Sequence, residues 1–212
     1  MSSTTARGPD RRERLIGAAR IVAREKGVAG LTVRAVATQA NVSTGSVLYH
    51  FDTFDELITA AVEGVMEEFY DRRRALAEGI PDVQARLLAL IEAGIPDEIS
   101  DDLRLLYESA ALVRIRSHLA PLARSVVERQ VQLYLTTLDI GSGLAVFRPR
   151  LPTPTIARHI VALEDAYDFY PVIGIPGDRA QIRESVVAYA ELALDTPLRP
   201  RPDPTPRSRA GS

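Results

Sequence analysis

The chain of 212 residues contains no cysteine, and this absence excludes several kinds of chemistry. Without thiols there is no disulfide framework, no thiolate metal site, no cysteine nucleophile and no thiol-based redox sensor. A reducing compartment suits such a sequence, and we therefore expect the protein to be cytoplasmic.

Long apolar runs are also missing. No stretch approaches the roughly 20 apolar residues of a membrane-spanning helix, and residues 1–10 lack the apolar segment of a signal peptide. We therefore expect neither export nor a membrane partner. Runs that alternate apolar and polar residues are not evident, whereas Ala, Leu, Arg and Glu are abundant. The sequence predicts an all-α fold.

Charge is unevenly distributed along the chain. The formal net charge is -2, but residues 1–50 carry eight Arg or Lys against three Asp or Glu, so this segment is basic and the rest is acidic. A basic N-terminal segment, here called the head, followed by an acidic remainder, here called the body, indicates that only the head binds a polyanion. All but one of the 26 cationic residues are arginine, which suits bidentate phosphate contacts, although a genome's base composition would produce the same bias.

Helical periodicity, capping residues and proline positions divide the chain. We expect a disordered arm (1–9), a three-helix helix-turn-helix domain (10–53), a larger helical effector-binding and dimerisation bundle (54–194) and a disordered Pro/Arg-rich tail (195–212) whose removal is harmless. The predicted helices cover residues 10–26, 33–40, 43–50, 53–78, 82–93, 101–115, 121–138, 154–170 and 178–194.

The most informative stretch begins at Leu31 and ends at Leu57, and reads LTVRAVATQANVSTGSVLYHFDTFDEL. A recognition helix must be short, and small or polar at its leading edge. Gly45 would let the backbone approach DNA, and the hydroxyl groups of Thr44 and Ser46 could bond base edges or phosphates. The residues expected one turn later, near backbone phosphates, are Tyr49 and His50, and those expected to pack behind the helix are Val42, Val47 and Phe51.

Across roughly residues 11–61 the sequence resembles the DNA-binding domain of TetR-family repressors. The resemblance rests on four motifs: Leu31-Thr32-Val33, Val42-Ser43-Thr44-Gly45, Tyr49-His50-Phe51 and Asp55-Glu56-Leu57. It implies a homodimer that binds double-stranded DNA at a pseudo-palindromic operator and releases it when a small-molecule effector enters the helical body. The DNA-binding residues that we expect are Thr32, Arg34, Ser43, Thr44, Gly45, Ser46, Tyr49 and His50.

Two positions depart from the family pattern. Leu48 stands where a tyrosine is common, and Phe54 replaces the lysine that usually begins the fourth helix and contacts a phosphate. Arginines of the N-terminal arm would supply the missing charge: Arg7, Arg11, Arg12 and Arg14. The alternative is a helical ligand-binding or protein-interaction module of the same fold that does not read DNA sequence, in which Arg34 is an ordinary solvated residue.

The resemblance is weaker in the helical body. Candidates for the ligand pocket are Phe69, Tyr107, Leu112 and Tyr134, with Arg114, Arg116 or His118 available for a polar group of a ligand. Candidates for the dimer interface are Ile160, Leu163, Tyr167, Val186 and Tyr189, although each stripe could instead face the core of its own chain. The sequence identifies neither the effector nor the operator.

Two acidic clusters raise the alternative of an enzyme, because helical prenyl-transferring enzymes hold magnesium and diphosphate between such clusters. Asp101-Asp102 lacks a partner, since Leu105 stands where another carboxylate is needed. Glu164, Asp165 and Asp168 are expected to form a solvated helix face. The three histidines, His50, His118 and His159, fit no metal or triad motif. We therefore predict no catalytic residues, no metal and no cofactor.

Overall fold

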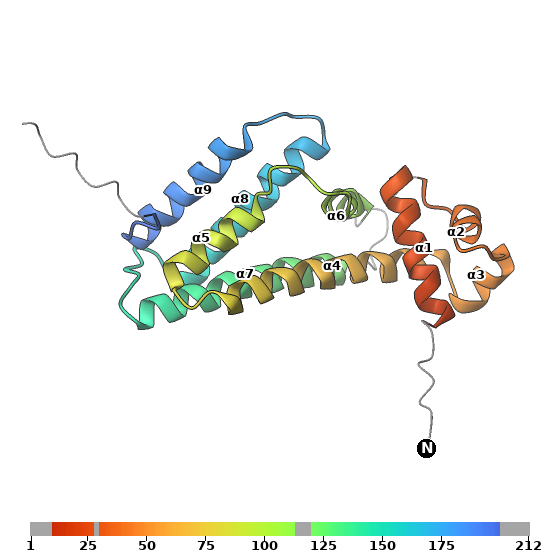
Figure 1. Cartoon of the computed structure of the whole chain (residues 1–212), viewed down its shortest axis with the longest axis horizontal. Coiled ribbons are helices and arrows are strands. Elements are labelled where there is room, and N and C mark those ends of the chain that lie inside the picture. Colours follow the sequence, from red (N-terminus) through yellow and green to blue (C-terminus); the bar gives the residue numbers. More distant parts are fainter. Residues whose placement is uncertain (1–9, 28–29, 113–119, 200–212) are drawn as a thin grey trace, which may run out of the picture.

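A computed structural model of the chain describes residues 10–27, 30–112 and 120–199, and every regular element in this part of the chain is an α-helix. The all-α prediction is therefore confirmed. Figure 1 shows the arrangement, with a head of three helices at one end of a longer helical body. The helices are α1 (Arg11–Lys26), α2 (Val33–Gln39), α3 (Thr44–His50), α4 (Phe54–Gly79), α5 (Val83–Gly94), α6 (Asp101–Leu112), α7 (Ala120–Gly143), α8 (Thr153–Val172) and α9 (Arg179–Leu194).

Side-chain caps fix the beginnings of the helices in the head. Thr32 accepts a hydrogen bond from the backbone N–H of Ala35 at 3.1 Å, which starts α2. Ser43 and Thr53 cap α3 and α4 in the same way. Capping satisfies backbone donors that have no partner in the first turn of a helix. These beginnings agree with the predicted ones for this physical reason.

One helix end in the body differs from the prediction. Helix α7 continues to Gly143, and Gly141 near its end leaves room for the ring of Phe147, which packs where a Cβ atom would stand. Phe147, which lies between two of the predicted helices, is only 2% exposed. Helix α6 is described as far as Leu112, and the segment that contains Arg114, Arg116 and His118 lies outside the described residues.

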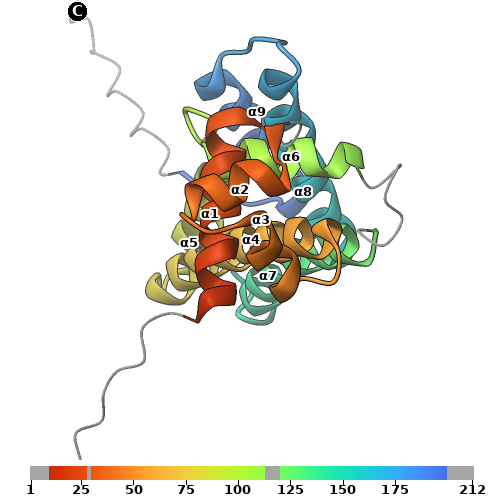
Figure 2. The same ribbon diagram turned by 90° about the vertical axis from the view of Figure 1, so that its right-hand side faces the viewer.

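The core of the head extends beyond the predicted domain boundary at residue 53. It combines apolar side chains of α1, α2 and α3 with the first half of α4, down to Met66, and with Leu105 of α6. Figure 2 shows the head end-on, with α1, α2 and α3 in front of the body. Helix α4 thus contributes to both cores, and the domain division at residues 53 and 54 stays a prediction.

The second core lies in the body, between the end of α4 and helices α5, α7, α8 and α9. Ile160 and Val186, predicted to contact a second copy of the chain, are fully buried here. Their side chains pack against neighbouring helices of the same chain, so the prediction is corrected for these two residues. Leu163, Tyr167 and Tyr189 are half-buried at the edge of this core.

The predicted disordered tail begins too early. Leu198 is 5% exposed and belongs to the body core, and its backbone N–H donates to Glu191 at 2.7 Å. The hydroxyl of Thr196 donates to the carbonyl of Val146. Leu198, an apolar residue among prolines, packs this segment against the body. The rest of the predicted tail (200–212) and the predicted arm (1–9) lie outside the described residues.

Ending the chain at Asp195 is therefore expected to lower the free energy of unfolding by about 2–4 kcal/mol, since Leu198 and its hydrogen bonds are lost. Chemical denaturation measures the change. A chain that ends at Arg199 is the matched control and should unfold like the full-length protein. Equal stability of the two truncated chains would contradict the role given to residues 196–198.

Candidate DNA-binding surface and effector cavity

The recognition helix α3 presents small and polar residues outward and apolar residues inward. Val47 and Phe51 are each 1% exposed, as predicted, while Tyr49 is 85% exposed and Thr44 and Gly45 are exposed. A Cβ atom added at Gly45 would meet only the Ser43 hydroxyl, at 3.8 Å. The surface at Gly45 is therefore open to a binding partner. Packing within the chain does not require a glycine at this position.

Two of the hydroxyl groups predicted to contact DNA also cap helices. Ser43 Oγ accepts from the backbone N–H of Ser46, and Thr32 Oγ1 accepts from that of Ala35, both at 3.1 Å. Each hydroxyl keeps its own hydrogen for donation to a phosphate oxygen. Arg34 is exposed on α2, and Ser46 and His50 are half-exposed on α3. All eight predicted residues thus come from α2, α3 and their caps.

The arginines of the predicted basic arm have different surroundings. Arg12 is held by Glu56 at 3.0 Å and lies over the ring of Phe51, 4.8 Å from its centroid. It therefore joins α1 to the start of α4, and its contact with a phosphate stays a prediction. Arg11 and Arg14 are exposed, and Arg7 lies outside the described residues. Phe54 is half-buried against the head core, which explains an apolar residue at this position.

A cavity of about 380 Å³ lies in the body between α4, α6, α7 and α8. Phe69 and Tyr107 line it, as predicted. Tyr134 does not line it, because its side chain is fully buried behind the wall, and the side chain of Leu112 lies outside the described residues. The other lining residues are Val62, Met66, Arg73, Gly94, Leu103, Leu106, Ser109, Ala123, Val126, Val127, Gln130, Val161, Glu164, Asp165, Ala166, Asp168 and Phe169.

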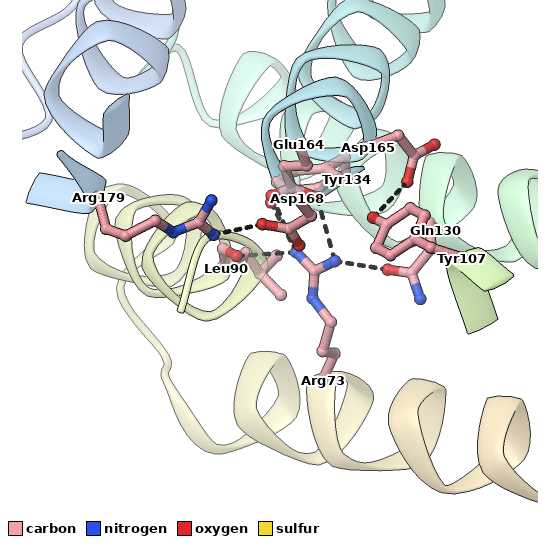
Figure 3. A network of polar contacts seen from close by, with 9 residues as sticks. All are labelled: Arg73, Leu90, Tyr107, Gln130, Tyr134, Glu164, Asp165, Asp168 and Arg179. Atoms are coloured by element: carbon pink, nitrogen blue, oxygen red, sulfur yellow. Dashed lines mark hydrogen bonds and ion pairs between the residues drawn. The ribbon is translucent and has the colours of Figure 1, made fainter. Parts of the chain in front are cut away.

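A buried arginine connects four helices at one side of this cavity (Figure 3). Arg73 of α4 donates to Glu164 of α8 through both terminal nitrogens, each at 3.2 Å. The partners that complete its coordination are the side chains of Gln130 and Tyr134 on α7, each at 2.7 Å, and the carbonyl of Leu90 on α5, at 2.8 Å. The Tyr134 hydroxyl donates to Glu164 as well. This network fixes α4, α5, α7 and α8 to one another.

Burial dominates the acid–base behaviour of the network. It raises the pKa of Glu164 to about 7, against the opposing effects of Arg73 and the Tyr134 hydroxyl. Burial alone would lower the pKa of Arg73, but the attraction of Glu164 outweighs it, so the pKa of Arg73 lies above its usual value and the guanidinium stays charged. Burial also raises the pKa of Asp168 to about 6, although Arg179 contacts this carboxylate.

The predicted solvated face of α8 is therefore wrong. Glu164 and Asp168 are 4% and 2% exposed, and Asp165 is half-buried at the cavity. A signal was present, because Ile160, Glu164 and Asp168 follow one another at intervals of four and so continue a buried helical stripe. Arg73 similarly continues the stripe of Met66 and Phe69 on α4. The helical spacing indicated that these positions are buried, but their charged side chains led to the prediction that they face solvent.

Gly94 lets the backbone of α5 lie against Glu164, since a Cβ atom at this position would overlap the carboxylate. We expect Gly94→Ala to lower the free energy of unfolding by about 1–3 kcal/mol, because Glu164 must leave its partners. Gly17→Ala is the control, since nothing lies within 4 Å of that site in α1; helix propensity should make it neutral or stabilising. Thermal or urea unfolding of both variants checks the prediction.

Comparison with known proteins relates the head of this chain to a family of regulators. Residues 15–61 match the family model of bacterial regulatory proteins, tetR family. Over 90 residues, 41% of this chain and 45% of the relative, the sequence is 38% identical to the HTH-type transcriptional regulator BetI of Burkholderia mallei (strain NCTC 10229). The chain thus spans less than half the length of this relative.

Solved structures extend the likeness over most of the chain. A TetR transcription regulator from Haloarcula marismortui ATCC 43049 has the same fold, with a TM-score of 0.78 and 23% identity over 86% of this chain and 97% of that one. The multidrug binding protein EbrR, complexed with imidazole, gives a TM-score of 0.62 with 29% identity over 92% of this chain and 98% of that one.

Residues 15–61 therefore match a domain of the TetR family of bacterial regulatory proteins, and most of the chain has the fold of a TetR transcription regulator of known structure. The BetI relative and the Haloarcula marismortui regulator act in transcription and are not enzymes, and the prediction that the protein is not an enzyme agrees with this likeness. The acidic pair at the start of α6 has a structural explanation, since Asp102 is bound by Arg24 of α1 at 2.7 Å. Among the described residues no helix is long and apolar enough to cross a membrane.

Proposed function

We propose that this protein is a homodimeric repressor that binds a pseudo-palindromic operator and leaves it when a small molecule enters the cavity between α4, α6, α7 and α8. The observation that carries the proposal is the double attachment of α6. Leu105 belongs to the core of the head, while Leu103, Leu106 and Tyr107 line the cavity. One helix therefore contacts both the site of binding and the DNA-reading unit.

The DNA contacts follow from the exposed surface of α2 and α3. Thr44, Gly45 and Ser46 would enter the major groove, and Arg34 would reach a base or a phosphate. Thr32, Ser43, Tyr49 and His50 would contact backbone phosphates. A dimer would present two such helices about 34 Å, one turn of DNA, or a multiple of it apart. Because it works on DNA, we place the protein in the cytoplasm.

The proposed dimer interface lies on α8 and α9. Leu192 is 66% exposed on α9, and Leu163, Tyr167 and Tyr189 are half-buried beside the body core. Tyr189 and His159 are joined by a hydrogen bond of 2.7 Å, which connects the two helices at this surface. A second copy would cover the apolar side chains that the body core leaves exposed.

Two ion pairs would transmit the effector's influence from the body to the head. Arg24 of α1 binds Asp102 of α6, and Arg20 of α1 binds Glu68 of α4. A ligand that favours a different position of α6 or α4 would move α1 with it and so change the spacing of the two heads. The extent to which the ligand releases the protein from DNA would then be set by the difference between its affinities for the two arrangements.

Ligands named for structural neighbours support a small-molecule effector. EbrR is complexed with imidazole, proflavin or ethidium, and a regulator from Saccharomonospora viridis of the same fold is in complex with choline. The alternative remains a module that keeps the fold and binds ligands or proteins without reading DNA. Its support is Phe54, which removes one cation from the surface that would face phosphates.

The test is a selection of genomic DNA fragments by the purified full-length protein at physiological salt, with sequencing of what is retained. Enrichment of a pseudo-palindrome is expected, because specific binding survives salt that abolishes purely electrostatic binding. Retention without any common sequence, by folded and dimeric protein, would reject the repressor in favour of the module. The genes beside enriched fragments would suggest the effector.

A further inference from the structure

The cavity has a wall of mixed character. Its apolar part includes three aromatic rings, those of Phe69 on α4, Tyr107 on α6 and Phe169 on α8. The rings of Tyr107 and Phe169 are tilted at 58°, with centroids 6.3 Å apart. Aromatic faces carry negative potential and attract cations, most strongly where water is excluded. The ring arrangement therefore favours a ligand that is apolar and positively charged over one that is only apolar.

Among the described lining residues, acidic side chains outnumber basic ones. The acidic residues are Glu164, Asp165 and Asp168, and the basic residue is Arg73. Arg73 is matched by Glu164. Asp168 is matched by Arg179, which reaches it from the start of α9 and whose other nitrogens are bound to backbone carbonyls. Asp165 therefore accounts for the excess of acidic side chains over their cationic partners.

Asp165 has no cationic partner among the described residues. In the described part of the chain its carboxylate accepts one hydrogen bond, of 3.3 Å, from the hydroxyl of Tyr107, and Figure 3 shows the two side chains directed toward one another. Burial raises the pKa of Asp165, and the Tyr107 hydroxyl only partly offsets this. A half-buried carboxylate without a counter-charge is costly, and a cationic ligand beside it would remove the cost.

Ser109 adds a second polar feature of the wall. The residue is 5% exposed and lines the cavity, and its hydroxyl has no hydrogen-bond partner in the described part of the chain. Buried hydroxyl groups in folded proteins are nearly always bonded. Ser109 and Tyr107 stand two positions apart on α6 and both line the cavity, so the free hydroxyl is available to bond a polar atom of the same ligand.

We infer that the effector of this regulator is an organic cation, whose charged group lies beside Asp165 and against the rings of Tyr107 and Phe169. The inference rests on the proposed function in one respect, the use of the cavity as the effector site. Both terminal nitrogens of Arg73 are engaged by Glu164, Gln130, Tyr134 and Leu90, and its charge is matched by Glu164. Only its Nε–H has no partner in the described part of the chain, so Arg73 offers an anionic ligand one donor but no unmatched charge. The network of Arg73 supports the wall, and Asp165 selects the charge.

The experiment compares three probes of similar shape by calorimetry on the full-length protein without DNA. Phenyltrimethylammonium carries a permanent positive charge, tert-butylbenzene is its neutral carbon analogue, and benzenesulfonate is an anion. We expect the cation to bind at least about tenfold more tightly than the neutral compound. Tighter binding of the neutral compound or the anion, or binding of none of the three, would overturn the inference.

Asp165→Asn identifies the residue responsible. It should weaken binding of the cation about tenfold and leave the neutral compound unchanged within about threefold. Asp71→Asn is the matched control, since it removes the same charge from an α4 side chain that is 58% exposed. Equal losses in both variants would contradict the assignment. Circular dichroism verifies that both variants are folded.

The calorimetric result is independent of DNA. If the cation binds but no operator is enriched, the ligand class stands and the repressor proposal falls. If an operator is enriched but the cation does not bind, the repressor proposal stands and the ligand class falls.

Discussion

Replacing Arg73 by methionine is expected to lower the free energy of unfolding by about 3–5 kcal/mol, because it leaves Glu164 buried without its cation. The side chains of the pair are each 5% exposed, so water cannot take the place of the guanidinium. The variant also removes a partner from Gln130, Tyr134 and the carbonyl of Leu90. Urea denaturation of the full-length protein, with the protein concentration held constant, measures the loss.

Two further variants separate the buried charge from a general effect of losing arginine. Arg74→Met removes a side chain that is 49% exposed and bonded to Asp71 and Glu78, and should cost no more than about 1 kcal/mol. The double variant Arg73→Met, Glu164→Gln should recover part of the stability, because no unpaired charge remains. A double variant less stable than Arg73→Met alone would show that the carboxylate stabilises the fold without the arginine.

Replacing Gly45 by leucine is expected to weaken operator binding at least about 100-fold while the fold is kept. A Cβ atom here meets only the Ser43 hydroxyl at 3.8 Å, so the longer side chain projects outward from the protein. On DNA the same side chain would occupy the space between the leading turn of α3 and the groove. Binding to the enriched operator, measured by fluorescence anisotropy, checks the loss.

Gly79→Leu is the matched control for this substitution. Gly79 ends α4 at the far end from the head, and nothing lies within 4 Å of its added Cβ atom. Both variants should unfold at the midpoint of the unmodified protein within about 3 °C, and only Gly45→Leu should lose the operator. Unchanged binding of Gly45→Leu would show that α3 does not dock through its leading turn.

The head could be predicted closely because its signals are local. Thr32, Ser43 and Thr53 each satisfy the backbone of the helix that they precede, and a cap is a property of four consecutive residues. The same is true of Gly45, whose openness depends on the short turn before it. The residues predicted to contact DNA lie close together in the sequence, because two consecutive short helices and their caps carry them.

The body could be predicted only in part, because its site is assembled from distant segments. Arg73 and Glu164 are separated by 91 positions. Each stands beside other residues of the same charge, so the sequence did not distinguish either of them as buried. Phe69 and Tyr107 were found because apolar aromatics suggest burial on their own. Asp165 and Ser109 were not, since nothing in a local pattern distinguishes a solvent-facing polar residue from one that lines a cavity.

The sequence by itself determined the helices, their caps, the apolar stripes and the recognition surface of the head. Tertiary structure decided which stripes pack on one another, and so assigned Ile160 and Val186 to the core of their own chain. It also decided that the acidic face of α8 is buried and that Leu198 is held against the body. The reason is physical: a helix forms through bonds over four residues, whereas the surroundings of a charge depend on every helix packed against it.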